Sequence, residues 1–287
     1  MKKLLLLSLM VVLGLSSCEL NKNNADPELV LKIGKDLSYK YSNIELYDSS
    51  THIVYFKELH PEFDKLVQVP FTFYANGTEI YTGSVWPAFY NSSPTGPFIY
   101  SPTIFYQNFA IRVDDWTKDK PDPRNDPVLM QSLKVHNLLH SGLSVEINPP
   151  VINGTLLTFL FTVTNQDKSD LLILDPDKTG TNLFHYFTNG LSIRNAANEY
   201  VFTSNIEVEF PSPSNIWKIE WLSSLKSGDS RQFTLNYTLS SALNQGEYTA
   251  LFEFPGLTSQ VSIDQLVQNG NRIWLGDVQA NKRFTIQ

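Results

Sequence analysis

The chain has 287 residues, a formal net charge of −7 and 42% hydrophobic residues, enough for one or two ordinary cores. The acidic charge argues against binding to nucleic acid or to anionic lipid surfaces, because both are negatively charged. Aromatic residues make up 13% of the chain, with 18 Phe and 13 Tyr, a composition that favours strands. The single cysteine, Cys18, excludes an intrachain disulfide, so the fold must rest on packing.

Residues 1–17 have the composition of a signal peptide. Lys2 and Lys3 precede an apolar run at residues 4–15, and small residues follow before Cys18. The run has about twelve residues, whereas a membrane-spanning helix needs about twenty, so a short transmembrane anchor is disfavoured. A plain secretory peptide is the other alternative, but it leaves a lone cysteine at the end of the leader unexplained.

The tetrad Leu15-Ser16-Ser17-Cys18 resembles the lipobox of bacterial lipoproteins. The resemblance implies cleavage before Cys18, a diacylglycerol thioether on its sulfur and a fatty acid such as palmitate on the new N-terminus. Several acyl chains together give stable anchoring. The body would then be tethered to the cell membrane or the outer membrane, facing the periplasm or the cell exterior. Because the lipid would occupy the sulfur, thiol catalysis is excluded.

Residues 18–28 are polar and Asn-rich, which indicates a flexible tether after the lipid; an ordered edge strand is the alternative. Strands are expected at 29–33, 43–47 and 53–57. The clearest local signal is Asn76-Gly77 between two strand-like runs. Both central residues of a type I′ turn need positive φ, which Asn and Gly tolerate, so the segment predicts a β-hairpin.

Residues 86–109 combine aromatic residues with prolines that forbid one long central strand. One interpretation is a set of core aromatics on two strands joined by a loop. The other is an exposed aromatic platform, since loops that carry aromatic residues are common places for recognition. Its candidate ligand-binding residues are Trp86, Phe89, Tyr90, Phe98 and Tyr100.

One clear helix is expected at 127–141, after a connector at 114–127 that is dense in Asp, Lys and Pro. Asp126 can cap it, Pro127 fits its first turn and Gly142 can close it. This helix ends an N-terminal β-rich domain expected at 29–143, and a second domain is expected at 144–287.

The second domain carries short strand-like segments separated by turn residues, a pattern that suggests a β-sandwich. The main ones are 156–164, 206–210, 217–221, 233–239, 248–254 and 272–276.

Residues 162–167, 226–229 and 245–250 resemble the strand-and-turn pattern of bacterial immunoglobulin-like domains, and the domain of bacterial intracellular proteinase inhibitors is similar. The resemblance covers about residues 155–255 and implies a tyrosine corner at Tyr248, whose hydroxyl would bond an upstream carbonyl. The fold expected for the whole chain is all-β: two immunoglobulin-like β-sandwich domains in tandem, with one helix near their junction.

Three segments contain candidate metal-binding or site residues. On a helix, His136 and His140 would share one face and could bind zinc. A metalloprotease has a Glu directly after the first His, but this chain has Asn137 there. A pair of surface histidines is therefore favoured. Residues 175–180 resemble the start of a calcium-binding loop, but position 12, which needs a bidentate Glu, is Tyr186. A turn capped by Asp side chains is favoured, and a structural calcium ion remains the alternative. The apolar segment 183–190 is typical of a buried strand. His185, which lies in it, is either a core histidine or a site residue.

No glycine-rich phosphate loop or Gly-x-Ser-x-Gly elbow occurs in the sequence. We therefore expect a non-enzymatic binding or structural module, without cofactor or metal, whose ligand is a glycan, a peptide or another envelope protein. The alternatives are a carboxylate-based hydrolase with an aromatic cleft, and a protease-inhibitor-like module with an exposed rigid loop in its second domain.

Overall fold

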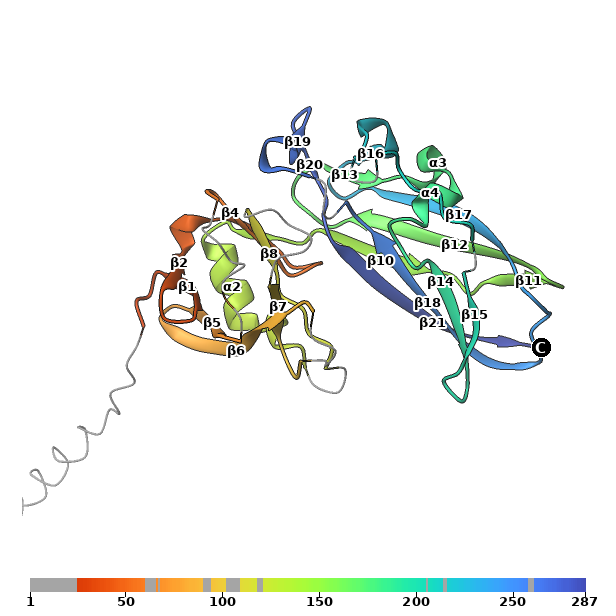
Figure 1. Ribbon diagram of the computed structural model, residues 1–287, viewed down its shortest axis with the longest axis horizontal. Helices are drawn as coiled ribbons and strands as arrows, with labels where there is room; N and C mark the ends of the chain where they lie inside the picture. The colour runs from red at the N-terminus through yellow and green to blue at the C-terminus, as the bar shows by residue number, and fades with distance from the viewer. Residues whose placement is uncertain are drawn as a thin grey trace, which may run out of the picture.

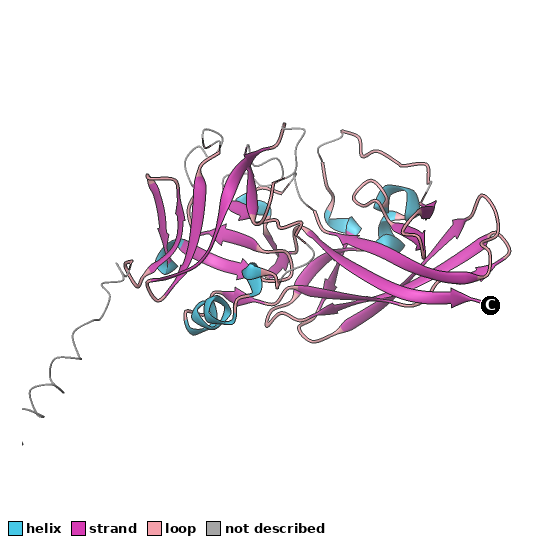
Figure 2. Cartoon of the chain, turned by 90° about the horizontal axis from the view of Figure 1, so that it is seen from below, coloured by secondary structure: helices cyan, strands magenta, loops and turns pink. Residues whose placement is uncertain are grey.

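The two halves of the chain lie side by side along the long axis of the computed structural model, with the C-terminus at the far end of the second half (Figure 1). The structure describes residues 25–59, 66, 68–89, 94–101, 109–117, 121–204, 206–213, 216–257 and 261–287. Cys18 and Tyr90 lie outside these ranges. Strands dominate and the helices are short, which confirms the expected all-β fold (Figure 2). No described helix has both the length and the apolar character needed to span a bilayer.

The described residues of the first half form two sheets, with strand orders β2-β1-β5-β6-β7 and β8-β4-β3-β9, and the helix α2 (Pro127–Val135). In chain order its elements are β1 (Leu29–Ile33), β2 (Leu37–Lys40), η1 (Tyr41–Asn43), β3 (Ile44–Asp48), β4 (Ile53–Phe56), β5 (Pro70–Ala75), β6 (Thr78–Pro87), β7 (Phe98–Ser101), β8 (Ala110–Arg112), η3 (Pro123–Asn125), α2 and β9 (Leu139–His140). The hairpin prediction is confirmed, because Asn76 and Gly77 join β5 to β6 with φ of 50° and 75°.

The core of the first half lies between its two sheets and under α2. Strand β5 buries Phe71 and Phe73, which alternate with less buried residues as a period of two requires. The ring of Phe73 lies 6.5 Å from that of Tyr47 on the second sheet. Helix α2 contributes Leu129 and Leu133 to the same cluster. The helix is therefore held by its apolar face.

The described residues of the second half form three sheets. Their strand orders are β10-β12-β11 with β17 on β12, β16-β13-β20-β19, and β15-β14-β18-β21. In chain order the elements are β10 (Leu143–Ile147), β11 (Val151–Asn153), β12 (Leu156–Asn165), β13 (Leu171–Leu174), α3 (Pro176–Thr179), α4 (Thr181–Phe184), β14 (Leu191–Asn195), β15 (Tyr200–Thr203), η4 (Ile219–Trp221), β16 (Leu222–Leu225), β17 (Ser230–Thr238), β18 (Gly246–Pro255), η5 (Ile263–Gln265), β19 (Val267–Gln268), β20 (Asn271–Ile273) and β21 (Asp277–Ile286).

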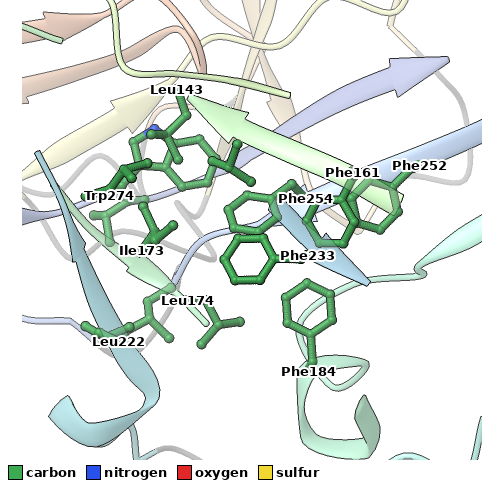
Figure 3. Close-up of a cluster of buried hydrophobic side chains, with 14 of the residues drawn as sticks. Leu143, Phe161, Ile173, Leu174, Phe184, Leu222, Phe233, Phe252, Phe254 and Trp274 are labelled. Atoms are coloured by element: carbon green, nitrogen blue, oxygen red, sulfur yellow. The ribbon is translucent and has the colours of Figure 1, made fainter. Parts of the chain in front are cut away.

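Two of these sheets pack face to face as a sandwich. Strand β12 buries every second residue, including Phe159 and Phe161. The ring of Phe161 lies 4.6 Å from Phe252 on β18 and 5.3 Å from Phe233 on β17. These rings lie together in the core with leucines around them (Figure 3). Aromatic packing between β12 and β18 thus joins the sheets, in agreement with the expected sandwich.

The core of the second half continues into the first half. Gly276 lies against the junction, and a Cβ there would come within 2.9 Å of both Thr51 side-chain carbons, so only glycine fits. Five buried residues of the first half belong to the hydrophobic cluster of the second: Leu46, Ile53, Tyr55, Phe109 and Ala110. The two halves therefore share apolar contacts in addition to the chain that links them.

The expected helix at 127–141 is correct at its start and wrong at its end. The Asp126 carboxylate accepts hydrogen bonds from the N–H groups of Val128 (2.8 Å) and Leu129 (3.3 Å). The helix stops at Val135 because Asn137 adopts a left-handed conformation, with φ of 60°, before Gly142 is reached. The chain then forms β9, which pairs with β3 in parallel.

Other expected boundaries also differ. The tether expected at 18–28 is too long, because Ala25 donates its N–H to the Gly77 carbonyl (3.0 Å) and Asp26 pairs with Lys40 (2.7 Å). Residues 183–190 begin in the helix α4 instead of a strand. The strands expected at 206–210 and 217–221 are absent from the described residues there: a coil precedes Pro211, and η4 covers Ile219–Trp221.

Candidate functional site

Three of the five candidate aromatic residues lie on one face of β6 and β7. Trp86 pairs with Tyr100 in parallel register, and Phe98 precedes Tyr100 by two residues, so their side chains point to the same side. Phe98 is fully buried, whereas Trp86 and Tyr100 are half-buried. The intervening Val85 and Ile99 face the core of the first half. The three rings therefore lie on the side of the sheet away from that core.

Trp116 adds a fourth ring that the sequence analysis missed. It packs edge-on against Phe98 with ring centroids 4.8 Å apart, and it lies 6.2 Å from Tyr100. Half of its surface, 51%, stays exposed. We call Trp86, Phe98, Tyr100 and Trp116 the aromatic platform. Phe89 is 71% exposed beyond the end of β6, and Tyr90 lies outside the described residues.

The signal for Trp116 was present in the sequence. A large apolar ring inside a connector rich in Asp, Lys and Pro has no local partner, so it either reaches a core or remains partly exposed for contact.

Charged side chains adjoin the aromatic platform. Phe98 and Asp114 exchange two backbone hydrogen bonds of 2.8 Å, which places the Asp114 side chain beside the rings. Arg112 Nε lies 2.9 Å from Asp114 Oδ1, and the same guanidinium binds both carboxylate oxygens of Asp277 in the second half. We call Arg112, Asp114, Asp277 and the neighbouring Glu253 the acid cluster.

Burial shifts the pKa of two acids in this cluster, Asp114 and Glu253, and of the adjoining Tyr100. It raises the pKa of Asp114; the Arg112 charge opposes the shift and the Asp277 charge reinforces it. Burial also raises the pKa of Glu253, again reinforced by Asp277. The pKa of Tyr100 is raised by burial and then by the charge of Asp114. The cluster thus presents hydrogen-bond donors and acceptors beside the platform, in a setting whose burial disfavours the ionised forms of Asp114 and Glu253.

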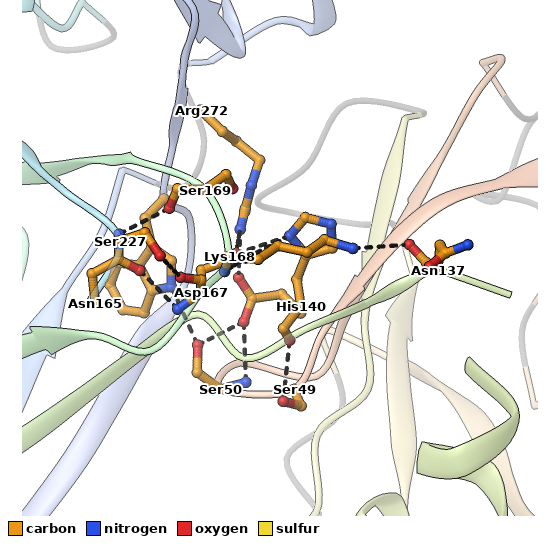
Figure 4. Close-up of polar contacts among 12 residues, drawn as sticks. Ser49, Ser50, Asn137, His140, Asn165, Asp167, Lys168, Ser169, Ser227 and Arg272 are labelled. Carbon is orange, nitrogen blue, oxygen red and sulfur yellow. Dashed lines mark hydrogen bonds and ion pairs between the residues drawn. The ribbon is translucent and has the colours of Figure 1, made fainter. Parts of the chain in front are cut away.

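A second polar network, built around the buried Asp48, Asp167 and Arg272, lies between the two halves (Figure 4). Arg272 Nη2 on β20 donates to Asp48 Oδ2 (3.2 Å) and to Asp167 Oδ2 (2.9 Å), and His140 Nδ1 lies 2.8 Å from Asp167 Oδ1. Burial alone would raise the pKa of Asp167, but the His140 hydrogen bond and the Arg272 charge hold that pKa below its usual value. Both carboxylates are buried and partnered, so this network fastens the halves together and is no ligand site.

The histidine pair expected on one helical face is separated in the structure. His136 stacks on Tyr41, with ring centroids 3.8 Å apart and planes 5° apart, while His140 contacts Asp167. Among the described residues no group of three or more His, Cys, Asp or Glu side chains is arranged to hold a metal ion. His185 is buried and its Nε2 lies 3.2 Å from the Tyr237 hydroxyl, an environment typical of a core histidine.

The Asp side chains of the suspected calcium loop have protein partners. Asp175 caps α3 by accepting the N–H of Asp177 (2.9 Å), and it also binds Arg231 (2.6 Å) and Ser223. The favoured turn capped by an Asp side chain is therefore confirmed. The tyrosine corner is confirmed as well, because the buried Tyr248 donates its hydroxyl to the Asn244 carbonyl at 2.8 Å.

No family model and no curated protein matches the chain. One of the solved structures that match is a β-glucosidase from Kluyveromyces marxianus in complex with glucose, at 11% sequence identity and a TM-score of 0.21. The match covers 50% of this chain and 14% of the β-glucosidase chain. A TM-score at this level carries no argument, so the functional proposal rests on the geometry of this chain.

Proposed function

We propose that the protein is a non-enzymatic binding module, held outside the cytoplasm by lipid on Cys18, that binds a neutral glycan on the aromatic platform. The observation that carries the proposal is the half-exposed Trp116, packed on Phe98 and Tyr100 beside the acid cluster. An exposed ring in a fixed orientation loses little conformational entropy when a ligand covers it.

The chemistry of the surface matches a sugar better than an apolar ligand. The C–H face of a sugar ring is apolar and can stack on a flat aromatic face, while its hydroxyls need donors and acceptors at the edge. Trp116 and Tyr100 supply the faces, and Arg112 and Asp114 supply the polar groups. A few placed polar groups beside an apolar wall are the usual composition of a small-ligand site.

Arg112 argues for binding instead of hydrolysis. A glycoside hydrolase uses two carboxyl groups, one as acid and one as base or nucleophile, on either side of the scissile bond. Here the Arg112 guanidinium forms ion pairs with both Asp114 and Asp277. These two carboxylates are therefore paired with the same cation and do not face each other across a site for a scissile bond. The raised pKa of Glu253 nevertheless gives the hydrolase alternative a candidate acid. Product analysis after long incubation with the bound glycan separates the two proposals.

The proposal is tested by titrating a soluble chain that starts at residue 19, and so lacks Cys18, with neutral glucose-, mannose- and xylose-based oligosaccharides in a calorimeter. We expect binding that Trp116→Ala weakens by at least about tenfold, equivalent to about 1.4 kcal/mol. Phe210→Ala is the matched control, because Phe210 is also exposed (69%) and, like Trp116, packs edge-on against another ring, that of Tyr186 in the second half. Equal affinities for the parent and Trp116→Ala would contradict the proposal, and tighter binding of peptides would favour a peptide ligand.

The membrane anchor is a separate part of the proposal. If Cys18 carries the lipid, the residues up to the first described one, Ala25, span at most about 25 Å when extended, which keeps the body close to the membrane. The parent chain should incorporate labelled palmitate, and the Cys18→Ala variant should not. Equal labelling of the two proteins would exclude lipidation at this cysteine.

A further inference from the structure

A polar hollow lies on the outer face of the sheet formed by β14, β18 and β21. Its volume is about 450 Å³, within the range of small-molecule sites. The cross-strand register pairs Ser192 with Leu251, Leu251 with Asn281, and Glu253 with Gln279, so these five side chains point to the same face. The floor therefore consists of one apolar residue among hydroxyl, amide and carboxyl groups.

One wall of the hollow is an aromatic ring held in place by an arginine. The Arg194 guanidinium carbon lies 4.2 Å from the centre of the Tyr200 ring, and Arg194 also donates to the Tyr200 hydroxyl and to Asn198 (2.9 Å). Tyr200 is 56% exposed although it lies in a strand of the sheet. The ring is thus fixed in orientation and accessible, as in the aromatic platform.

Strand β21 connects the hollow to the acid cluster. Asp277, Gln279 and Asn281 alternate along β21, so they line one face of the strand at intervals of about 6.8 Å. Asp277 binds Arg112 at one end of this row, and Gln279 bonds Glu253 (3.2 Å) inside the hollow. The row extends for about 13 Å from Asp277 to Asn281, which is longer than one sugar ring.

We propose that the hollow is a second subsite for the ligand of the aromatic platform, so that the ligand is a neutral oligosaccharide that crosses the junction between the halves. The inference rests on the proposed function. The ligand is neutral because the guanidinium of Arg112 is occupied by Asp114 and Asp277, and that of Arg194 is engaged by Tyr200 and Asn198. A negatively charged chain would instead meet the carboxyl groups of Asp277 on β21 and Glu253 on β18.

The test compares neutral oligosaccharides of two and six units, made of glucose, mannose or xylose, by calorimetry with the same soluble chain from residue 19. For the sugar series that binds, we expect the six-unit chain to bind at least about tenfold tighter than the two-unit chain. Tyr200→Ala and Gln279→Ala should each reduce this preference severalfold and leave two-unit binding unchanged. Both side chains are largely exposed, so their removal leaves the core intact.

The outcomes separate this inference from the proposed function. Trp116-dependent binding with no gain from chain length, or with a gain that Tyr200→Ala and Gln279→Ala both leave intact, overturns the second subsite alone. Absence of Trp116-dependent binding for every sugar overturns both. A preference for a sulfated or uronic-acid six-unit chain over its neutral counterpart overturns the neutral ligand.

Discussion

Replacing Arg272 by Met should destabilise the whole protein, because the guanidinium is the shared cation of two buried carboxylates at the junction. Its Nη2 lies 3.2 Å from Asp48 and 2.9 Å from Asp167, and both acids are fully buried. At an effective dielectric constant of about 20, each contact is worth about 5 kcal/mol of Coulomb attraction, most of which offsets desolvation. Removing one partner of such a set leaves uncompensated charge, at a cost of about 3–5 kcal/mol.

The measurement is urea denaturation followed by circular dichroism and tryptophan fluorescence. Arg283→Met is the matched control, since Arg283 is exposed on β21 and its loss should change the free energy of unfolding by less than about 0.5 kcal/mol. Adding Asp48→Asn to Arg272→Met should recover about 1 kcal/mol or more, because Arg272 is the cation that pairs with the buried Asp48, whereas Asp167 keeps its contact with His140.

An Arg272→Met midpoint equal to that of the control would refute this reasoning. The shared core at the junction further predicts that both probes report one transition in the parent. Two separate transitions would show that the halves unfold independently.

Other predictions concern single residues. Tyr248→Phe should cost about 0.5–1.5 kcal/mol, the net contribution of its hydrogen bond to the carbonyl of the exposed Asn244, whereas Tyr200→Phe should cost less, both measured by urea denaturation. Phe161→Ala should cost about 3–5 kcal/mol, against less than about 0.5 kcal/mol for the exposed Phe210→Ala; similar midpoints would contradict the described core. The lowered pKa of Asp167 means that its contribution to stability is present above its unfolded-state pKa and is lost as pH falls through the folded-state pKa. The free energy of unfolding should therefore decline in acid below about pH 4, less steeply in Asp167→Asn, and identical slopes would contradict the assignment.

Features set by neighbouring residues could be predicted from the sequence. The Asn76-Gly77 turn, the Asp126 cap and the Tyr248 corner each depend on groups within four residues of one another. The end of the helix was predicted wrongly even though it is also a local feature. Asn137 adopts positive φ and ends the helix before Gly142 is reached. Local rules specify which conformations are available, and the tertiary contacts decide among them.

The junction and the candidate site depend on contacts between distant residues. Arg272 and Asp48 are 224 positions apart, and Arg112 and Asp277 are 165 apart. No periodicity in the chain indicates which distant acid an arginine will meet. Trp86, Phe98 and Tyr100 were singled out by composition, but their common face follows from the parallel pairing of β6 with β7, and Trp116 joins them only in the folded chain.

The most direct test of the platform uses the indole N–H signals of the five tryptophans in a heteronuclear NMR titration with the neutral six-unit oligosaccharide that binds best. Assignment by single replacement of each tryptophan with Phe identifies the signals. A glycan on the aromatic platform should shift the Trp116 signal and, less strongly, that of Trp86, while the buried Trp274 stays unchanged. Shifts confined to Trp217 and Trp221, with Trp116 unaffected at saturation, would place the ligand elsewhere and contradict the account.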